Sequence, residues 1–171
     1  LWHRAANDPD ELRSMMQSVL PMLIDYGYWN DALAGLENAI NLHQRDRVMA
    51  PLARYYAGLL HFRRADFSQA QKYTTEALEG FQAAQQVRSQ VMAHNLLGHI
   101  YKAIGNYSAA REAYEAARTL TPESDSRQYA ACLTNIALLL QAQGDYSAAR
   151  PLYNQALQLC EETLEPTHPD I

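Results

Sequence analysis

Apolar and polar residues alternate along most of the chain with the period of an amphipathic helix. One such stretch runs through Leu97, Ile100, Tyr101 and Ile104, which are spaced as one helical face requires. Alanine and leucine number 27 and 22, whereas valine and isoleucine number only four and six. Because alanine favours helices and β-branched residues favour strands, the sequence predicts an all-α fold.

The helical stretches are separated by a turn motif that occurs four times. In each copy an aromatic residue is followed three positions later by an alanine, and each turn lies between two helical stretches. The aromatic residues lie 38, 40 and 39 residues apart and are Trp29, Phe67, Tyr107 and Tyr146. Repetition at this period predicts four helix pairs stacked in sequence order. We expect these pairs at residues 9–45, 46–86, 87–123 and 124–163. Residues 1–8 would be a leader or the end of a preceding element, and residues 164–171 the start of a truncated next repeat.

Each turn has its own sequence signals. Glycine occupies the expected left-handed cap of the first helix in three pairs, whereas Ala65 stands there in the second pair. We therefore expect the Ala65 turn to close by another geometry or with some strain. Serine is expected to cap the helix that follows the turn. The glycines are Gly27, Gly105 and Gly144, and the serines are Ser68, Ser108 and Ser147.

Two prolines test the predicted helices. Pro21 lies inside the first predicted helix and is expected to kink or break it. Pro151 is expected in the first turn of the last helix, where its missing N–H costs little.

The charge and the apolar pattern exclude several function classes. The net charge is −5, and the chain has only two lysines, Lys72 and Lys102, so nucleic-acid binding is not expected. No apolar run is long enough to span a membrane, and no signal-peptide pattern is present, so we expect a cytoplasmic location and no membrane partner. The two cysteines, Cys132 and Cys160, form no CxxC pair and are expected to be packed thiols.

No catalytic or metal-binding motif is present. The sequence contains no phosphate-binding glycine loop, no zinc-protease motif and no nucleophile elbow. The six histidines are scattered, and His61 and His94 are expected to face the core. We therefore expect neither a cofactor nor a metal, and no enzymatic activity.

The third helix pair carries the clearest family pattern. Leu97-Gly98-x-x-Tyr101, followed by Ala110-x-x-x-Tyr114, resembles the tetratricopeptide repeat (TPR) family, with small Gly98 and Ala110 letting the two helices approach closely. The other pairs fit in register. The period near 39 exceeds the family's 34 and is similar to that of the longer repeats of kinesin light chains. A looser similarity extends to TPR regions of bacterial signalling NTPases and LuxR-type regulators.

The resemblance implies a right-handed αα-superhelix of about four helix pairs and a non-catalytic interaction scaffold. The first helix of each pair would line a concave groove that holds a peptide or a partner segment. Carried onto this chain, the groove positions are Tyr55, Leu59, Phe62, Arg63, Asn95, His99, Lys102, Thr134, Leu138 and Gln141. Arg63 and Lys102 could hold a carboxylate. As an alternative for the aromatic residues, Tyr55 and Phe62 would simply pack against neighbouring helices.

A different function remains open from the sequence. The chain could be a sensor or regulatory segment of a larger signalling NTPase or transcription regulator, binding a small effector or a neighbouring domain of the parent chain. We also expect end-to-end association with a second copy through the open face of the last pair. Its apolar residues are Leu152, Leu157, Leu159 and Leu164.

Overall fold

The computed structural model describes residues 14–19 and 27–164. These residues form helices and no strands, and the predicted all-α repeat fold is confirmed. A π-helical turn spans Met15–Val19. The α-helices are α4 (Trp29–Leu42), α5 (Met49–Arg63), α6 (Phe67–Ala83), α7 (Val87–Ala103), α8 (Tyr107–Leu120), α9 (Ser126–Ala142) and α10 (Tyr146–Leu164). The predicted leader, the predicted kink at Pro21 and the segment after Leu164 lie outside the described residues.

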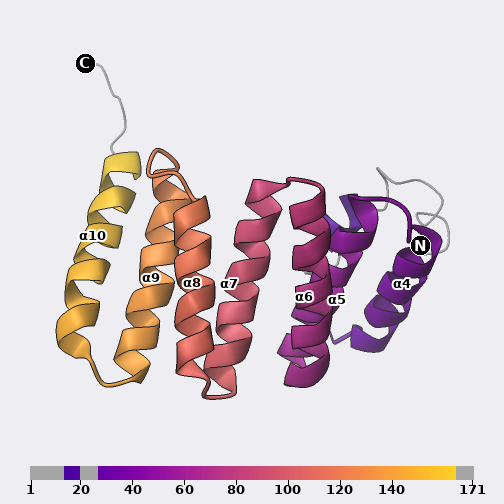
Figure 1. Cartoon of the computed structure of the whole chain (residues 1–171), viewed down its shortest axis with the longest axis horizontal. Coiled ribbons are helices and arrows are strands. Elements are labelled where there is room, and N and C mark those ends of the chain that lie inside the picture. Colours follow the sequence, from indigo (N-terminus) through magenta and orange to yellow (C-terminus); the bar gives the residue numbers. More distant parts are fainter. Residues whose placement is uncertain (1–13, 20–26, 165–171) are drawn as a thin grey trace.

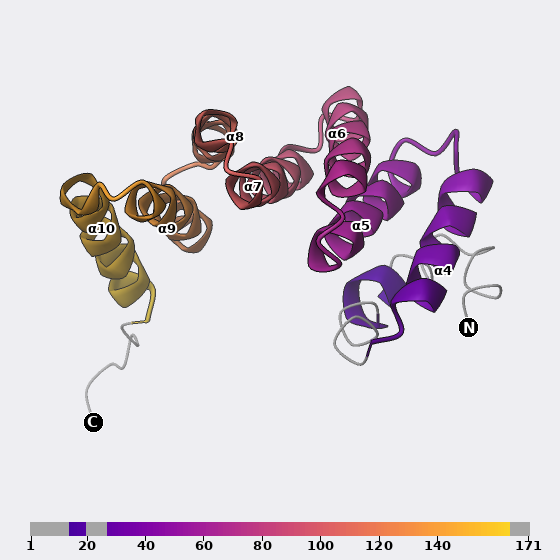
Figure 2. The same ribbon diagram turned by 90° about the horizontal axis from the view of Figure 1, so that it is seen from below.

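From α4 to α10, each helix packs against the next in a single row (Figure 1). The row is bent into an arc, with α5, α7 and α9 on its inner side and α6 and α8 on its outer side (Figure 2). The inner helices also contact one another directly, α5 with α7 and α7 with α9. This arrangement makes the first helices of successive pairs one continuous layer.

The turns that end α5, α7 and α9 share one geometry. Gly105 and Gly144 have φ values of 79° and 82°, and Ala65 adopts the same left-handed region with φ 60°. The backbone N–H of Asp66 donates to the carbonyl of His61, just as that of Asn106 donates to Tyr101. The expectation of another geometry at Ala65 was wrong, and the strained alternative holds, because the helix-ending hydrogen bonds impose φ > 0 whichever residue is present.

The helix caps correct one sequence prediction. The caps of α6, α8 and α10 are Asp66, Asn106 and Asp145, whose side-chain oxygens accept from the backbone N–H three residues later. Each serine expected to cap is instead the second residue of its helix. The Ser147 hydroxyl donates to Asp145 at 2.8 Å and so supports the cap. A carboxylate or amide directly after the left-handed residue is placed to reach the first free N–H groups.

Pro151 also differs from its predicted place. α10 begins at Tyr146, so Pro151 is its sixth residue and lies inside the helix. Its ring lacks the N–H that would donate to the carbonyl of Ser147. Both residues are exposed, so that carbonyl can bond to water while the helix continues to Leu164.

The tight crossing within the third pair is as the sequence predicts. Tyr114 is fully buried against α7. A Cβ atom added to Gly98 would lie 2.3 Å from the Cε1 atom of the Tyr114 ring. Only a residue without a side chain lets α7 and α8 approach this closely.

Candidate binding surface

All ten residues predicted for the groove lie on the three inner helices. Tyr55, Leu59, Phe62 and Arg63 lie on α5, Asn95, His99 and Lys102 on α7, and Thr134, Leu138 and Gln141 on α9. These helices run in the same direction, so their carboxyl ends lie along one edge of the row, at the bottom of Figure 1. Arg63, Lys102 and Gln141 all belong to the last turns at that edge.

The apolar residues on α5 are largely engaged in packing. Tyr55 is half-buried against Ala77, Phe81 and Ala93, and burial raises the pKa of its phenol to about 12. Phe62 and Leu59 pack with Tyr55 around a buried group formed by Ala70, Leu96 and Ile100. These contacts match the alternative given in the sequence analysis, in which Tyr55 and Phe62 pack against neighbouring helices.

His99 lies at the contact between α5 and α7. Its ring packs 6.4 Å from that of Phe62, and its Nδ1 atom lies 2.8 Å from the Tyr114 hydroxyl. Burial, together with the charge of Lys102, lowers the pKa of His99. A neutral imidazole that accepts from Tyr114 at Nδ1 carries its proton on Nε2, which then remains a donor.

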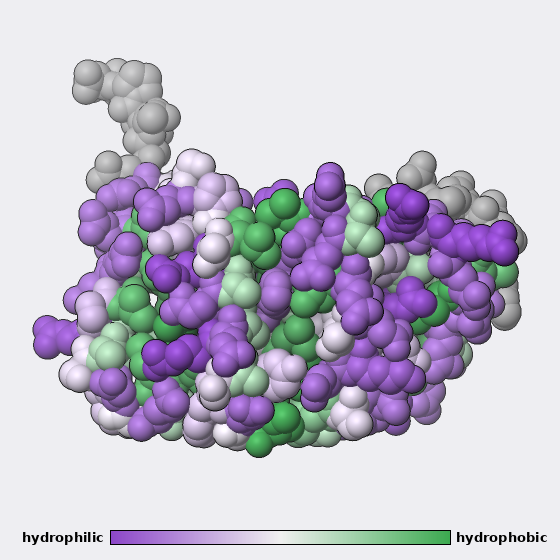
Figure 3. Space-filling model, in the orientation of Figure 1, coloured by the Kyte–Doolittle hydropathy of each residue, from purple (hydrophilic) through white to green (hydrophobic). Residues whose placement is uncertain are grey.

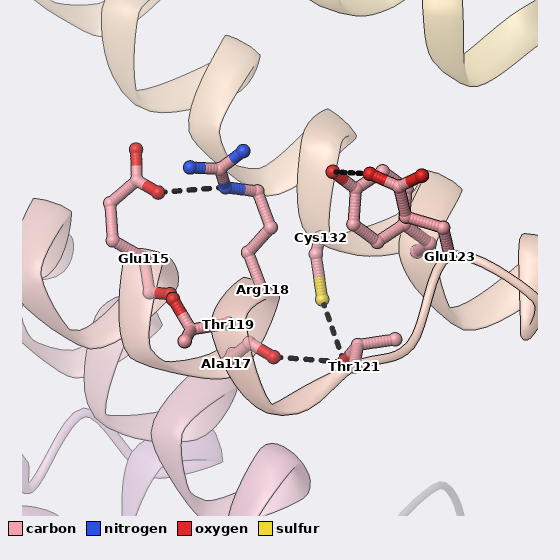
Figure 4. A network of polar contacts seen from close by, with 8 residues as sticks. Glu115, Ala117, Arg118, Thr119, Thr121, Glu123 and Cys132 are labelled. Carbon is pink, nitrogen blue, oxygen red and sulfur yellow. Dashed lines mark hydrogen bonds and ion pairs between the residues drawn. The ribbon is translucent and has the colours of Figure 1, made fainter.

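An asparagine pair joins α7 to α9. The Nδ2 atom of Asn135 donates to Oδ1 of Asn95 at 3.0 Å. Burial raises the pKa of the Cys132 thiol on α9, despite the hydrogen bond between this thiol and the Thr121 hydroxyl. Figure 4 shows Cys132 pointing toward Thr121, at 3.6 Å. The side-chain oxygen of Asn95 is therefore engaged within the protein.

Asn135 was not among the predicted site residues. The spacing of the two asparagines could have indicated it, because they lie 40 residues apart, which is within one residue of the repeat period. Two polar residues near equivalent positions of successive first helices are brought together when these helices pack side by side.

The remaining predicted groove residues are less engaged in packing between the helices. Arg63 is exposed and Lys102 half-buried, and neither forms an ion pair within the described part of the chain. Leu138 is 39% exposed. The Thr134 hydroxyl donates to the carbonyl of Ala130, and Gln141 accepts from the Tyr153 hydroxyl at 2.8 Å. The surface thus combines two cationic groups with one exposed aliphatic side chain.

The opposite, outer side of the arc is mostly hydrophilic, with smaller apolar patches between the polar side chains (Figure 3). Among residues 14–19 and 27–164, no group of three histidine, cysteine or acidic side chains could hold a metal ion. None of the described helices is both long and apolar enough to cross a membrane.

Comparison with known proteins points to one family. A family model described as "Tetratricopeptide repeat" matches residues 88–162 and, in a second match, residues 129–171. Among curated proteins, none matches this chain.

Two solved structures are similar over nearly the whole chain. The crystal structure of BtubC (BKLC) from P. vanneervenii has a TM-score of 0.78 and 19% identity, covering 96% of this chain and 68% of that chain. The crystal structure of MamA protein has a TM-score of 0.64 and 22% identity, covering 96% and 80%. At these identities the likeness shows a shared fold.

Proposed function

Because the chain belongs to the tetratricopeptide repeat family, whose repeats generally mediate protein–protein interaction, we propose that it is a scaffold holding a peptide segment of a partner protein against α5, α7 and α9. The inner side of the arc is formed by the first helices of three successive pairs, α5, α7 and α9 (Figure 2). An extended peptide crossing these helices would contact all three.

The two cations at the edge of this surface carry the proposal. Arg63 ends α5, and Lys102 is the last residue but one of α7. Since neither is paired with a carboxylate of the described chain, both can bind an acidic side chain or the carboxyl end of a partner peptide. Leu138, on the next inner helix, offers an apolar contact to the same peptide.

The structure changes which substitutions test this idea. Asn95→Ala would remove the bond to Asn135 and would confuse a loss of binding with a loss of stability. Arg63→Glu combined with Lys102→Glu instead reverses two charges that make no ion pair within the described residues. A matched control is Arg88→Glu with Arg127→Glu, which reverses two exposed arginines near the opposite ends of α7 and α9.

The experiment selects peptides from a random peptide display library on the immobilised protein. We expect the selected peptides to contain acidic residues beside an aliphatic one. Their affinity should fall about tenfold or more with the Arg63 and Lys102 variant, because replacing two attractive charges by two repulsive ones costs at least about 1.4 kcal/mol of binding free energy. The control variant should keep the wild-type affinity. Selected peptides that bind both variants equally would show that the groove assignment is wrong.

A small-effector site has weaker support. A hollow of about 220 Å³ lies between the start of α7 and the turn from α8 to α9, lined in part by Val87, Leu120 and Pro122. Ligand pockets usually have volumes of about 300–1,000 Å³, so this hollow is small for a metabolite. A larger hollow of about 410 Å³ is lined by residues of α6 alone, and another of about 340 Å³ lies on α9 and α10. None of the three lies on the surface where α5, α7 and α9 come together, so the sensor function ranks second.

A further inference from the structure

The hollow of about 220 Å³ lies where the start of α7, the end of α8 and the turn into α9 meet. Much of its wall is apolar and is formed by Val87, Val91 and Leu120. Val87 is 49% exposed, so this wall is open to solvent. Figure 3 shows apolar side chains at the upper edge of the molecule, over the neighbouring ends of α7 and α8. The hollow is therefore accessible to a ligand from outside.

Phe81, near the end of α6, shows what fills the equivalent place in the second helix pair. It is 1% exposed and packs with Ala77 of α6 and Ala93 of α7. Forty residues later in the chain, Thr121 directly follows α8. Thr121 contacts Cys132 of α9, which lies 39 residues after Ala93 and so within one residue of the same repeat spacing. The same position thus carries an aromatic ring in the second pair and a small side chain in the third.

A second difference between the two pairs keeps the hollow open. Gly80 of α6 lets Pro51 of α5 pack closely, since a Cβ atom added to Gly80 would lie 2.3 Å from the Cγ atom of Pro51. The residues forty positions later are Leu120 and Val91, and both line the hollow. Because Leu120 has a side chain where Gly80 has none, α7 and α8 cannot approach as closely at this point as α5 and α6 do.

The turn beside the hollow is held in place by hydrogen bonds. The Thr121 hydroxyl donates to the carbonyl of Ala117 at 2.8 Å and lies 3.6 Å from the Sγ atom of Cys132 (Figure 4). The N–H of Asp125 donates to the carbonyl of Pro122 at 2.9 Å, and the Asp125 carboxylate caps α9 by accepting from a backbone N–H at 3.3 Å. Because these contacts already fix the turn, binding costs little ordering of the protein.

The size and the charge of the hollow indicate one uncharged aromatic side chain. An apolar cavity of about 150 Å³ can take up a benzene molecule. This hollow is somewhat larger, at about 220 Å³. The two charged residues that line it, Arg88 and Asp125, have opposite signs, so their charges balance. Phe81 shows that the repeat accommodates a phenyl ring at this position.

We propose that this hollow receives a phenylalanine side chain of a partner protein. The ring contacts Val87, Val91 and Leu120 and takes the place that Phe81 fills in the second pair. The hollow lies near the amino ends of α7 and α9, at the edge of the row opposite Arg63. The proposal therefore concerns a different surface from the groove and stands without it.

This chain has no spare phenylalanine to fill the hollow. Its three phenylalanines are Phe62, Phe67 and Phe81. Phe62 and Phe67 pack around a buried group between α5, α6 and α7, and Phe81 is itself buried. A second copy could supply one of these rings only by unpacking its own helices. The phenylalanine therefore comes from a different protein.

The probe is N-acetyl-L-phenylalaninamide, which carries the phenylalanine side chain on an uncharged backbone. Its binding to the isotopically labelled protein is followed by the NMR chemical shifts of the backbone amides. We expect saturable shifts confined to residues around the hollow, with a Kd of about 1–10 mM, as is usual for so small a ligand. N-acetyl-L-alaninamide, which lacks the ring, should cause no saturable shifts.

Two variants test whether the hollow is the site. Val87→Asp puts a charge on the apolar wall and should abolish the saturable shifts. It should fold, because Val87 is exposed and begins α7, where a negative charge is favourable. Ile104→Asp is the matched control, since Ile104 is 48% exposed at the opposite end of α7, and it should bind as wild type. Thr121→Phe, which introduces the ring found at Phe81, should also prevent binding.

Several results would overturn the proposal. Shifts that are absent in wild type, or that Val87→Asp leaves unchanged, would remove the hollow from consideration. Shifts that are lost instead with Arg63→Glu and Lys102→Glu would place the probe in the groove. Free L-phenylalanine binding more tightly than the probe would show that the hollow holds an amino acid through its charged groups, and not a segment of a protein.

Discussion

Replacement of Gly98 by alanine tests how tightly α7 and α8 are packed. The added Cβ atom would lie 2.3, 2.5 and 2.7 Å from three carbons of the Tyr114 ring. Ordinary van der Waals contact begins at 3.4 Å, so the ring must move by about 1 Å. Tyr114 cannot simply swing away, because it is fully buried and bonded to His99.

Two opposing effects set the size of the destabilisation. Overpacking of a rigid core usually costs about 1–3 kcal/mol. Alanine is also a better helix former than glycine by about 0.5–1 kcal/mol, which offsets part of this cost. We therefore expect Gly98→Ala to lower the free energy of unfolding by up to about 2 kcal/mol, a fall in Tm of about 2–4 °C for each kcal/mol in a domain of this size.

Urea unfolding of a double-mutant cycle provides the assay. Tyr114→Leu removes the ring that alanine would strike, so the double variant should be less destabilised than the sum of the two single variants. Tyr114→Phe keeps the ring and is the control, in which Gly98→Ala should cost the same as in wild type. If Gly98→Ala changes the free energy of unfolding equally in the wild-type and Tyr114→Leu backgrounds, the close contact described above does not exist.

Three further predictions concern histidines, a turn and a helix cap. Burial lowers the pKa of His94 and His99 in the folded state. As the pH falls, the unfolded chain therefore binds protons at these histidines before the folded chain does. The Tm should be highest above about pH 6.5 and should fall as the pH drops below that value. Ala65→Gly should stabilise the protein by up to about 1 kcal/mol in urea unfolding, because glycine relieves the left-handed strain. Asp145→Ala should destabilise the start of α10, seen as faster amide exchange there at neutral pH.

Each of these predictions has a contradicting result. A Tm that is constant between pH 8 and 5, or a pH profile unchanged by His94→Gln with His99→Gln, would exclude the histidine effect. Ala65→Gly less stable than wild type would mean that chain entropy outweighs strain at that turn. Asp145→Asn is the control for the cap, since an amide oxygen accepts the same hydrogen bond.

The repeat architecture was largely predictable because its signals are local. Helical periodicity and the recurring turn residues act between positions a few residues apart, and the closeness of Gly98 to Tyr114 follows from residue size. The exact caps were harder to predict, since Asp66, Asn106 and Asp145 compete with serines two residues later for the same backbone N–H groups. Only the backbone path through the left-handed residue decides that competition.

The burial and hydrogen bonding of the candidate binding residues depend on how the helices stack. The order of residues was enough to predict which helices form and which of their positions repeat, because those properties depend on neighbours along the chain. Whether Asn95 is open to a ligand or bonded to Asn135 depends on a residue a full repeat away. Such contacts exist only once the helices stack, so burial and hydrogen bonding at the surface follow from tertiary packing and not from local pattern.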